Sequence, residues 1–214
     1  DVGGSMYLEK YQDSYEFIDN NMKIMSNTFD LLKRCSKPFI FTSSQMSDMG
    51  YSTYGLCKAI GEKFTNCIGG LNVRLWNVYG NEKDLEKSHV ITDFINKARN
   101  TSNINMLTNG QEERQFLHAD DCSECLYILS KEYHLLDRDK KYHITSFEWT
   151  SIENIAKIVC TNFEGATYTP SDRKDMVHQG WKTEPDKHIL NYWKPKINLE
   201  EGIHQLIESS NVSN

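Results

Sequence analysis

The sequence lacks a long apolar run. Its uninterrupted apolar stretches, such as Phe39-Ile40-Phe41, are only a few residues long, whereas a helix that spans a bilayer needs roughly 20 apolar residues. The opening residues, Asp1-Val2-Gly3-Gly4, show neither the basic segment nor the apolar segment of a signal peptide. We therefore expect a soluble, cytoplasmic protein with no contact to a membrane.

The sequence also lacks a basic cluster. Its 24 Lys and Arg are outnumbered by 30 Asp and Glu, which gives a net charge of -6. Nucleic-acid-binding domains need a concentrated basic patch to neutralise phosphates. We therefore expect no nucleic acid as a partner, and any anionic ligand must be held by a few local side chains.

Paired metal-binding motifs are missing as well. The six cysteines are scattered, and only Cys122 and Cys125 have a C-x-x-C spacing. A structural zinc site needs a second pair of ligands at suitable spacing, and the sequence has none. We therefore expect no metal site, and reduced thiols that suit a cytosolic compartment.

The first part of the chain alternates between helical and strand patterns. Residues 15–35 carry apolar side chains at three- and four-residue steps, with basic residues in the last turn, which predicts a helix. Residues 39–41 predict a short buried strand, 54–64 a second helix and 71–76 a second strand. This alternation predicts an α/β fold with a parallel sheet.

The remaining chain continues the pattern less regularly. We predict helices near 89–99, 119–133, 152–163 and 199–207, and strands at 104–107 and 142–145. With 214 residues the chain is short for two complete domains. We therefore expect a sheet domain in residues 1–81 and a smaller α+β lobe in 82–214, with about 116–146 returning to the first sheet.

Residues 39–58 carry the clearest chemistry. Ser43 and Ser44 follow directly on the apolar strand, and Tyr54 and Lys58 lie four residues apart in the next helix. This spacing places both on one helix face, and a neighbouring ammonium favours the phenolate form of a tyrosine. Parallel sheets bind ligands at the carboxyl ends of their strands. A serine there can hydrogen-bond a substrate oxygen while the tyrosine exchanges a proton, which predicts interconversion of a carbinol and a carbonyl. Taken alone, Tyr-x-x-x-Lys is also typical of a solvated helix face.

Four sequence blocks carry a family resemblance through their order and spacing. They are Phe39 to Ser44, Tyr54 to Lys58, Arg74 to Gly80 and Arg114 to Asp121. Together they resemble the extended short-chain dehydrogenase/reductase family of NAD(P)-dependent nucleotide-sugar epimerases, reductases and dehydratases. The likeness covers nearly the whole chain and implies a Rossmann-like parallel sheet, of which this chain holds the C-terminal part, with a smaller α+β substrate lobe.

The resemblance also implies roles for individual residues. By it, Ser43 contacts the substrate, Tyr54 is the acid/base, and Lys58 lowers the pKa of Tyr54 and holds the nicotinamide ribose. His89 would be a second proton donor. The residues implied at the cofactor, NAD or NADP, are Asn21, Thr42, Tyr54 and Lys58. Those implied at a UDP- or GDP-linked sugar are Ser44, Asn77, Arg114 and Arg173.

Several of these residues keep a structural alternative. Arg114 and Asn77 would bind the diphosphate, to which a planar guanidinium is well suited. Arg114 can instead form a surface ion pair with Asp120 or Glu113, and Asn77 can simply form a turn. Arg173 can belong to a solvated charge run.

Histidines and asparagines near helix ends are ambiguous too. His89 can be only a polar helix cap. His118 with the two aspartates after it can turn the chain into the next helix, with Asp as N-cap. Asn20 leaves the register of Asn21 open.

The chain departs from the family pattern in three ways. Gln45 stands where one epimerase/reductase branch has a reactive cysteine, and an amide cannot shuttle a proton. The Asp-Glu pair of the dehydratase branch is missing after Ser44. The gap between Ser44 and Tyr54 is shorter than is typical. These departures leave 4-epimerisation or ketone reduction as the predicted reaction.

A glycine-rich phosphate loop is missing. A dinucleotide site needs a strand-to-helix turn whose glycines let the backbone approach the pyrophosphate, and no such motif occurs here. We therefore expect a fragment of a longer enzyme, with a homodimer as the family's usual assembly. The alternative is a catalytically incomplete module that binds a sugar nucleotide or serves in oligomerisation.

Overall fold

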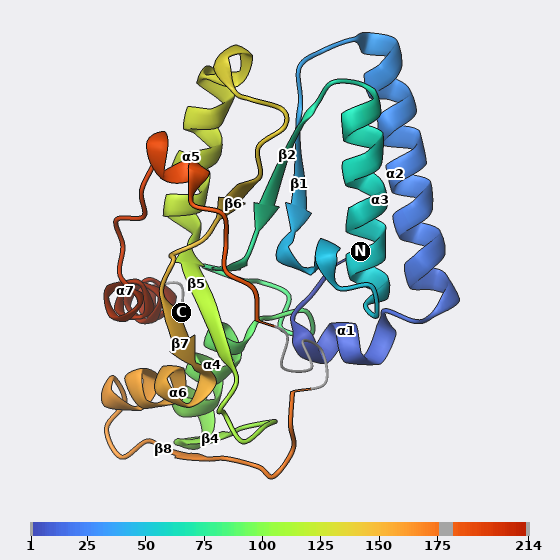
Figure 1. Ribbon diagram of the computed structural model, residues 1–214. Coiled ribbons are helices and arrows are strands. Elements are labelled where there is room, and N and C mark those ends of the chain that lie inside the picture. The colour runs from blue at the N-terminus through green and yellow to red at the C-terminus, as the bar shows by residue number, and fades with distance from the viewer. Residues whose placement is uncertain (1, 176–181, 213–214) are drawn as a thin grey trace.

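The computed structural model describes residues 2–175 and 182–212. Its first sheet is parallel, with strand order β1-β2-β6, formed by β1 (Ile40–Ser44), β2 (Leu71–Leu75) and β6 (Tyr142–Ile144). Helices α2 (Tyr15–Cys35) and α3 (Thr53–Cys67) cover one face, and α5 (Ala119–Lys131) lies on the other (Figure 1). The predicted Rossmann-like α/β class is confirmed.

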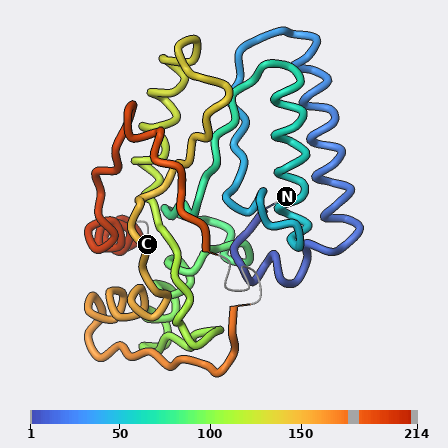
Figure 2. Tube along the Cα trace, viewed as in Figure 1, coloured from blue at the N-terminus to red at the C-terminus, as the bar shows by residue number. Residues whose placement is uncertain are grey.

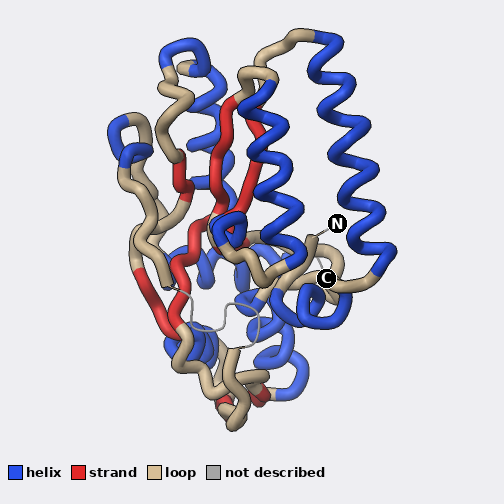
Figure 3. The backbone as a smooth tube through the Cα atoms, turned by 45° about the vertical axis from the view of Figure 1, so that its right-hand side comes forward, coloured by secondary structure: helices blue, strands red, loops and turns tan. Residues whose placement is uncertain are grey.

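Local signals explain why these elements form. In α2 the Ser14 side chain accepts a hydrogen bond from the backbone N–H of Phe17, which caps the helix, and Ser36 ends it in the left-handed conformation. The strands lie between helical layers (Figure 3). Leu71 and Val73 of β2 pack with Leu129 of α5 in one of the molecule's main apolar cores.

A second sheet begins where the first one ends. The chain leaves β2 at Leu75 and enters β3 (Asn77–Tyr79), which pairs in parallel with β5 (Glu113–His118). Strand β7 (Trp149–Ser151) pairs antiparallel with β5. Of the segment predicted to return to the first sheet, β6 joins that sheet and α5 packs on it, whereas β5 belongs to the second.

The remaining elements pack around the second sheet. They are α4 (Val90–Thr101), α6 (Ile152–Thr161) and α7 (Leu199–Val212), with the parallel pair β4 (Asn103–Asn105) and β8 (Thr167–Thr169) at the edge. Single-turn helices η1 (Gln45–Asp48), η2 (Tyr133–Leu135) and η3 (His188–Asn191) connect elements. The core here draws on Tyr79, Phe94, Ile155 and Ile203. The division of the chain at residue 81 stays a prediction.

A short helix near the start of the chain was not predicted. α1 (Ser5–Tyr11) lies at the carboxyl end of the first sheet, beside the segment that ends at Asp175 (Figure 2). Its Leu8 is buried. Within the described ranges, none of the helices combines the length and the apolar character that a bilayer crossing requires.

Candidate functional site

Ser43 and Ser44 point in different directions at the end of β1. The Ser43 hydroxyl donates to Glu62 Oε1 at 2.6 Å. The Ser44 hydroxyl accepts from the backbone N–H of Met46 at 3.2 Å and so begins η1. Because successive side chains of a strand alternate between its two faces, the two hydroxyls serve different surroundings.

Tyr54 starts α3 close to η1. Ser52 caps the helix by accepting from the backbone N–H of Gly55, and a Cβ at Gly55 would lie 2.2 Å from the Met46 carbonyl oxygen. Only glycine therefore allows α3 to approach η1 so closely. This approach brings the Tyr54 hydroxyl into a hydrogen bond with the Ser44 side chain.

The environment of Tyr54 keeps its phenol protonated. Tyr54 is 8% exposed and packs with Leu8, Phe17, Met46 and Met49. Burial raises the pKa of Tyr54 to about 12, and the hydrogen bond with Ser44 only partly opposes this rise. In this state burial thus moves the pKa of Tyr54 away from the predicted phenolate, and the effect of the Lys58 ammonium on Tyr54 stays a prediction.

Lys58 is directed to the backbone of β1. Its Nζ donates to the Thr42 carbonyl oxygen at 2.9 Å and lies 5.7 Å from the centre of the Tyr54 ring. Burial lowers the pKa of Lys58. Tyr54, Lys58, Thr42 and Ser44 thus form one cluster at the carboxyl end of β1, which we call the Tyr54 cluster.

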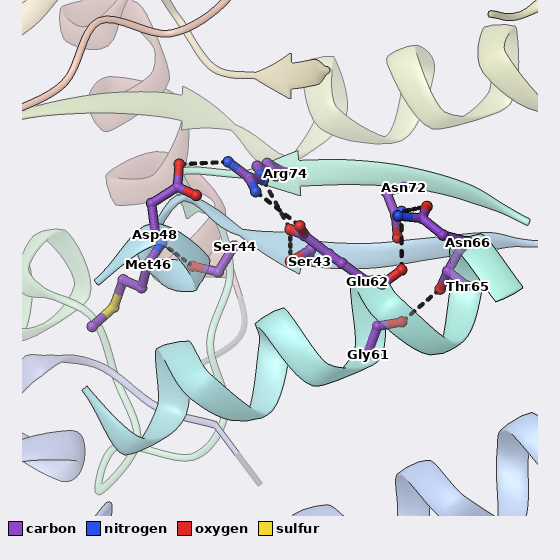
Figure 4. A network of polar contacts seen from close by, with 10 residues as sticks. All are labelled: Ser43, Ser44, Met46, Asp48, Gly61, Glu62, Thr65, Asn66, Asn72 and Arg74. Carbon is purple, nitrogen blue, oxygen red and sulfur yellow. Dashed lines mark hydrogen bonds and ion pairs between the residues drawn. The ribbon is translucent and has the colours of Figure 1, made fainter. Parts of the chain in front are cut away.

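Arg74 of β2 is the centre of a polar network that includes Glu62 and Asp48 (Figure 4). It is 8% exposed. Its Nε and Nη2 donate to the two oxygens of Glu62, each at 2.8 Å, and its Nη1 donates to Asp48 Oδ2 at 2.6 Å. Burial opposes the ionisation of Glu62, but the hydrogen bonds from Arg74 and Ser43 outweigh it and lower its pKa. Ser43, which the sequence placed in the proton relay, is therefore engaged by Glu62, and Ser44 is the serine beside Tyr54.

A cleft lies on the other side of α1. Residues of α1, β3, α4 and β5 line it, together with the segment that ends at Asp175. Among its lining residues are Asn77, His89, Arg114 and Arg173. The structure thus brings four sequence-predicted residues together, and we call this the arginine cleft.

Both arginines of the cleft are paired with carboxylates. Arg114 is buried, forms an ion pair with Asp175 and donates to the Glu113 carbonyl oxygen at 2.7 Å. Arg173 donates to Glu9 Oε1 at 2.6 Å. The pair that the sequence suggested between Arg114 and Asp120 does not form, because Asp120 lies in the first turn of α5 beside His118.

Asn77 lies at the start of β3 and His89 at the start of α4, and both line the cleft. Asn77 Nδ2 donates to the Gln115 carbonyl oxygen at 3.1 Å. His89 stands at the N-cap position of α4, but its side chain makes no capping hydrogen bond. The cap interpretation therefore does not explain its side chain.

The two groups do not share one cavity. Within the described chain, Ser44, Tyr54 and Lys58 do not line the arginine cleft. Helix α1 lies between them, because its Leu8 belongs to the same buried apolar cluster as Tyr54 whereas its Ser5 and Glu9 line the cleft. Asn21 lies in α2, and its Nδ2 donates to the Phe17 carbonyl oxygen at 2.8 Å.

Sequence reasoning missed the charged residues that support the site. Two signals in the sequence could have predicted the Arg74 network. A charge in a buried strand needs a partner, so Arg74 in the strand at 71–75 predicts a nearby carboxylate, and Glu62, four residues after Lys58, is a candidate. Asp175 and Glu82 carried no local signal. The cap of α5 was also misplaced: His118 Nδ1, not an aspartate, accepts from the backbone N–H of Asp120.

The cysteines show no metal-binding arrangement. Cys122 and Cys125 are both buried in α5. Over residues 2–175 and 182–212, no group of three or more His, Cys, Asp or Glu is placed to hold a metal ion.

The fold and the match to a family model define the class of protein. Residues 3–145 match the model of the NAD dependent epimerase/dehydratase family, and the chain belongs to this family. The resemblance drawn from the four sequence blocks is confirmed.

Particular relatives are similar over much of the chain. It is 29% identical over 170 residues to a GDP-L-fucose synthase of Sinorhizobium fredii, covering 74% of this chain and 52% of the relative. It is 26% identical over 165 residues to a putative UDP-glucose 4-epimerase of Methanocaldococcus jannaschii, covering 73% and 52%. The chain thus spans about half the length of these relatives.

Solved structures share the fold. The UDP-glucose 4-epimerase of Thermotoga maritima, determined with UDP-glucose, superimposes with a TM-score of 0.79 at 17% identity, covering 100% of this chain and 76% of that one. The dTDP-glucose 4,6-dehydratase of Bacillus anthracis, determined with NAD, gives a TM-score of 0.75 at 15% identity, covering 94% and 71%.

Proposed function

We propose that this chain serves in an NAD(P)-dependent nucleotide-sugar epimerase or 4-keto reductase. The observation that carries the proposal is the Tyr54 cluster, in which the Tyr54 hydroxyl bonds to Ser44 at the end of β1 and Lys58 lies one turn further along α3. A hydroxyl pair at a strand's carboxyl end suits proton exchange with a substrate oxygen. The relatives' names support the substrate class.

Each residue of the cluster has a proposed task. Tyr54 gives its proton to the oxygen of a keto sugar or takes it back from the hydroxyl. A phenol whose pKa is raised to about 12 by burial is a proton donor at neutral pH, which suits the reducing direction. Ser44 holds the same oxygen by a hydrogen bond, and Lys58 supplies the positive charge that stabilises the phenolate once the proton has left. We assign the serine role to Ser44 in place of Ser43.

The residues present fit part of a dinucleotide. Thr42, Tyr54 and Lys58 offer hydroxyl and ammonium groups at the end of β1, where the nicotinamide ribose would lie, and Asn21 of α2 is a further proposed contact. The described chain contains no glycine-rich strand-to-helix turn for the pyrophosphate. When bound, NAD or NADP would supply and accept the hydride.

The arginine cleft is the proposed site for the diphosphate of the nucleotide sugar. Because α1 lies between this cleft and the Tyr54 cluster, the proposal requires α1 to shift so that the sugar of the same ligand reaches Tyr54. Arg114 and Arg173 are suited to a diphosphate, because a guanidinium forms paired hydrogen bonds with phosphate oxygens. Asn77 offers an amide at the same edge, and His89 a further proton-exchanging group. We propose UDP- or GDP-linked sugars as ligands.

Replacement of Tyr54 by Phe tests the mechanism. The hydroxyl is lost while the ring and its packing remain, so turnover of UDP- or GDP-sugars with NAD(H) or NADP(H) should fall by at least about 100-fold. The measurement is made in the whole protein that carries this chain. Turnover that is unchanged in Tyr54→Phe would remove the relay.

One observation favours the second candidate, a sugar-nucleotide-binding or oligomerisation module without turnover. Tyr54 is buried in one apolar cluster with Leu8 of α1, and both cleft arginines are already paired with carboxylates. Isothermal titration of the whole protein that carries this chain with UDP-glucose, GDP-mannose, NAD and NADP measures binding, and a turnover assay with the same ligands distinguishes the candidates. Binding of sugar nucleotide without any turnover in the whole protein would favour the module.

Assembly and location complete the proposal. Helices α2 and α3 expose apolar side chains, namely Ile18, Ile24, Leu31, Leu56, Ile60 and Phe64. We propose that this face mediates a homodimer. All six cysteines are free thiols, which suits a reducing compartment, and the cytoplasm is the proposed location.

A further inference from the structure

Glu82 holds His89 at two points from outside the arginine cleft. His89 Nδ1 lies 2.5 Å from Glu82 Oε1, and the His89 backbone N–H donates to Glu82 Oε2 at 2.9 Å. Glu82 lines a separate hollow between α4 and α7, with Thr92 and Leu206, and is not among the cleft residues. His89 thus lines the cleft while its partner Glu82 lines the neighbouring hollow.

The carboxylate dictates which ring nitrogen carries the proton. Burial opposes the ionisation of Glu82, but hydrogen bonds from His89 and Thr92 outweigh it and lower its pKa. An ionised carboxylate only accepts hydrogen bonds, so Nδ1 must be the donor. Nε2 is then the nitrogen that gains and loses a proton. Within the described chain it has no hydrogen-bond partner.

We propose that Glu82 is a positioning residue that fixes the proton of His89 on Nδ1 and leaves Nε2 to exchange a proton with a ligand in the arginine cleft. That this ligand is a nucleotide sugar rests on the proposed function. The position of the proton on Nδ1 does not depend on which ligand binds. A carboxylate behind a histidine fixes ring orientation and tautomer in this way in other proton-transfer sites.

Other charged groups line the arginine cleft or precede His89 in the chain, and several of them form ion pairs with partners other than His89. Asp93, one turn further along α4, bonds to Lys97 at 2.7 Å. The arginines of the cleft pair with Asp175 and Glu9. The remaining charged residues that line the cleft are Glu112 and Lys174, and those of the preceding loop are Lys83, Asp84, Glu86 and Lys87. Glu82 is the acidic group in contact with the ring.

The variant Glu82→Gln tests the tautomer. The His89 backbone N–H can only donate, so the oxygen of the introduced amide will take it and the amide NH₂ will face Nδ1. That arrangement forces the neutral ring to carry its proton on Nε2. Nitrogen-15 chemical shifts of the His89 ring, assigned by their loss in His89→Asn, report the tautomer in the 214-residue chain. Glu86→Gln, in the same loop, is the matched control, because Glu86 accepts from the Tyr11 hydroxyl.

We expect an Nδ1–H ring in the wild type and in Glu86→Gln, and an Nε2–H ring in Glu82→Gln. An Nε2–H ring in the wild type would overturn the proposal without need of any variant, and so would an unchanged tautomer in a folded Glu82→Gln. Thermal melting verifies folding.

Turnover in the whole protein gives a second readout. We expect Glu82→Gln to lower kcat by about 100-fold while KM for the sugar nucleotide changes little, and a loss confined to KM would contradict the proposal. If turnover is absent altogether, the proposed function fails while the tautomer measurement still decides the role of Glu82.

Discussion

At the scale of single residues, the two adjacent serines of β1 have separable roles. Ser43 donates to the charged Glu62, and Ser44 bonds to Tyr54. We expect Ser43→Ala to lower the free energy of unfolding by about 1.5–3 kcal/mol, because a hydrogen bond to a charged group is lost, with turnover reduced less than in Ser44→Ala. Ser44→Ala should lower turnover by about 100-fold at a smaller cost in stability. Urea denaturation and steady-state kinetics of both variants measure this, and the reverse order of effects would contradict the assignment.

Glu62 gives the protein a pH-dependent contribution to stability. Its pKa in the folded state lies below its ordinary value of 4.5, so the ionised form favours folding. This contribution is fully present above pH 4.5 and is lost as the pH falls through the lowered value. We expect the free energy of unfolding of the wild type to fall over this window more steeply than that of Glu62→Gln. The exposed Glu164→Gln serves as control and should follow the wild type.

At the scale of elements, Arg74 joins four pieces of structure. Its partners Glu62 and Asp48 and their neighbour Ser43 come from α3, η1 and β1, while Arg74 itself is in β2. We expect Arg74→Met to lower the free energy of unfolding by about 3–5 kcal/mol, because it leaves Glu62 buried without its cation. Arg34→Met, which removes an exposed pair with Asp30, should cost less than about 1 kcal/mol. If urea denaturation gave equal losses in the free energy of unfolding for the two variants, the Arg74 network would contribute no more to stability than an exposed ion pair.

The segment before residue 176 controls the charge of the arginine cleft. Asp175 forms an ion pair with Arg114, whose guanidinium is proposed to bind the diphosphate. We expect Asp175→Asn to tighten binding of UDP by about tenfold, because a like-charged neighbour of the phosphates is removed and Arg114 is released. Isothermal titration at fixed ionic strength measures this, with Asp172→Asn as control. Unchanged or weaker binding would argue against a diphosphate at Arg114.

At the scale of the whole molecule, the exposed apolar face of α2 and α3 predicts self-association. Ile60 is 42% exposed, so Ile60→Asp should leave the fold intact and disrupt a dimer formed through this face. Sedimentation should give twice 24.9 kDa for the wild type and one subunit for the variant. Leu135→Asp is the control, because Leu135 is 77% exposed in η2, away from this face. A wild type with the mass of one subunit would contradict the dimer.

The sequence predicted the long elements well because their signals are local. Residues 15–35 became α2, 54–64 lie inside α3 and 71–76 became β2, since helical periodicity and short apolar runs depend on near neighbours. It missed α1, the three-residue strands β3, β7 and β8, and the six-residue strand β5. The strand expected at 104–107 overlaps β4, which spans Asn103–Asn105. A strand of three residues exists only through a partner distant in sequence, as in the pairing of β4 with β8.

By itself, the sequence determined the family and the α/β class, because residue type and spacing are enough for these, and it supplied the candidates for proton exchange. Only the tertiary structure decided which serine lies beside Tyr54. The alternation of side chains along a strand predicts that Ser43 and Ser44 point to opposite faces of the sheet, but it does not predict on which face the tyrosine lies. The tertiary structure also decided the direction of the Tyr54 pKa, because Leu8 and Phe17 bury the phenol. The pairing of Glu82 with His89 and of Asp175 with Arg114 likewise depends on how the loops fold over the second sheet.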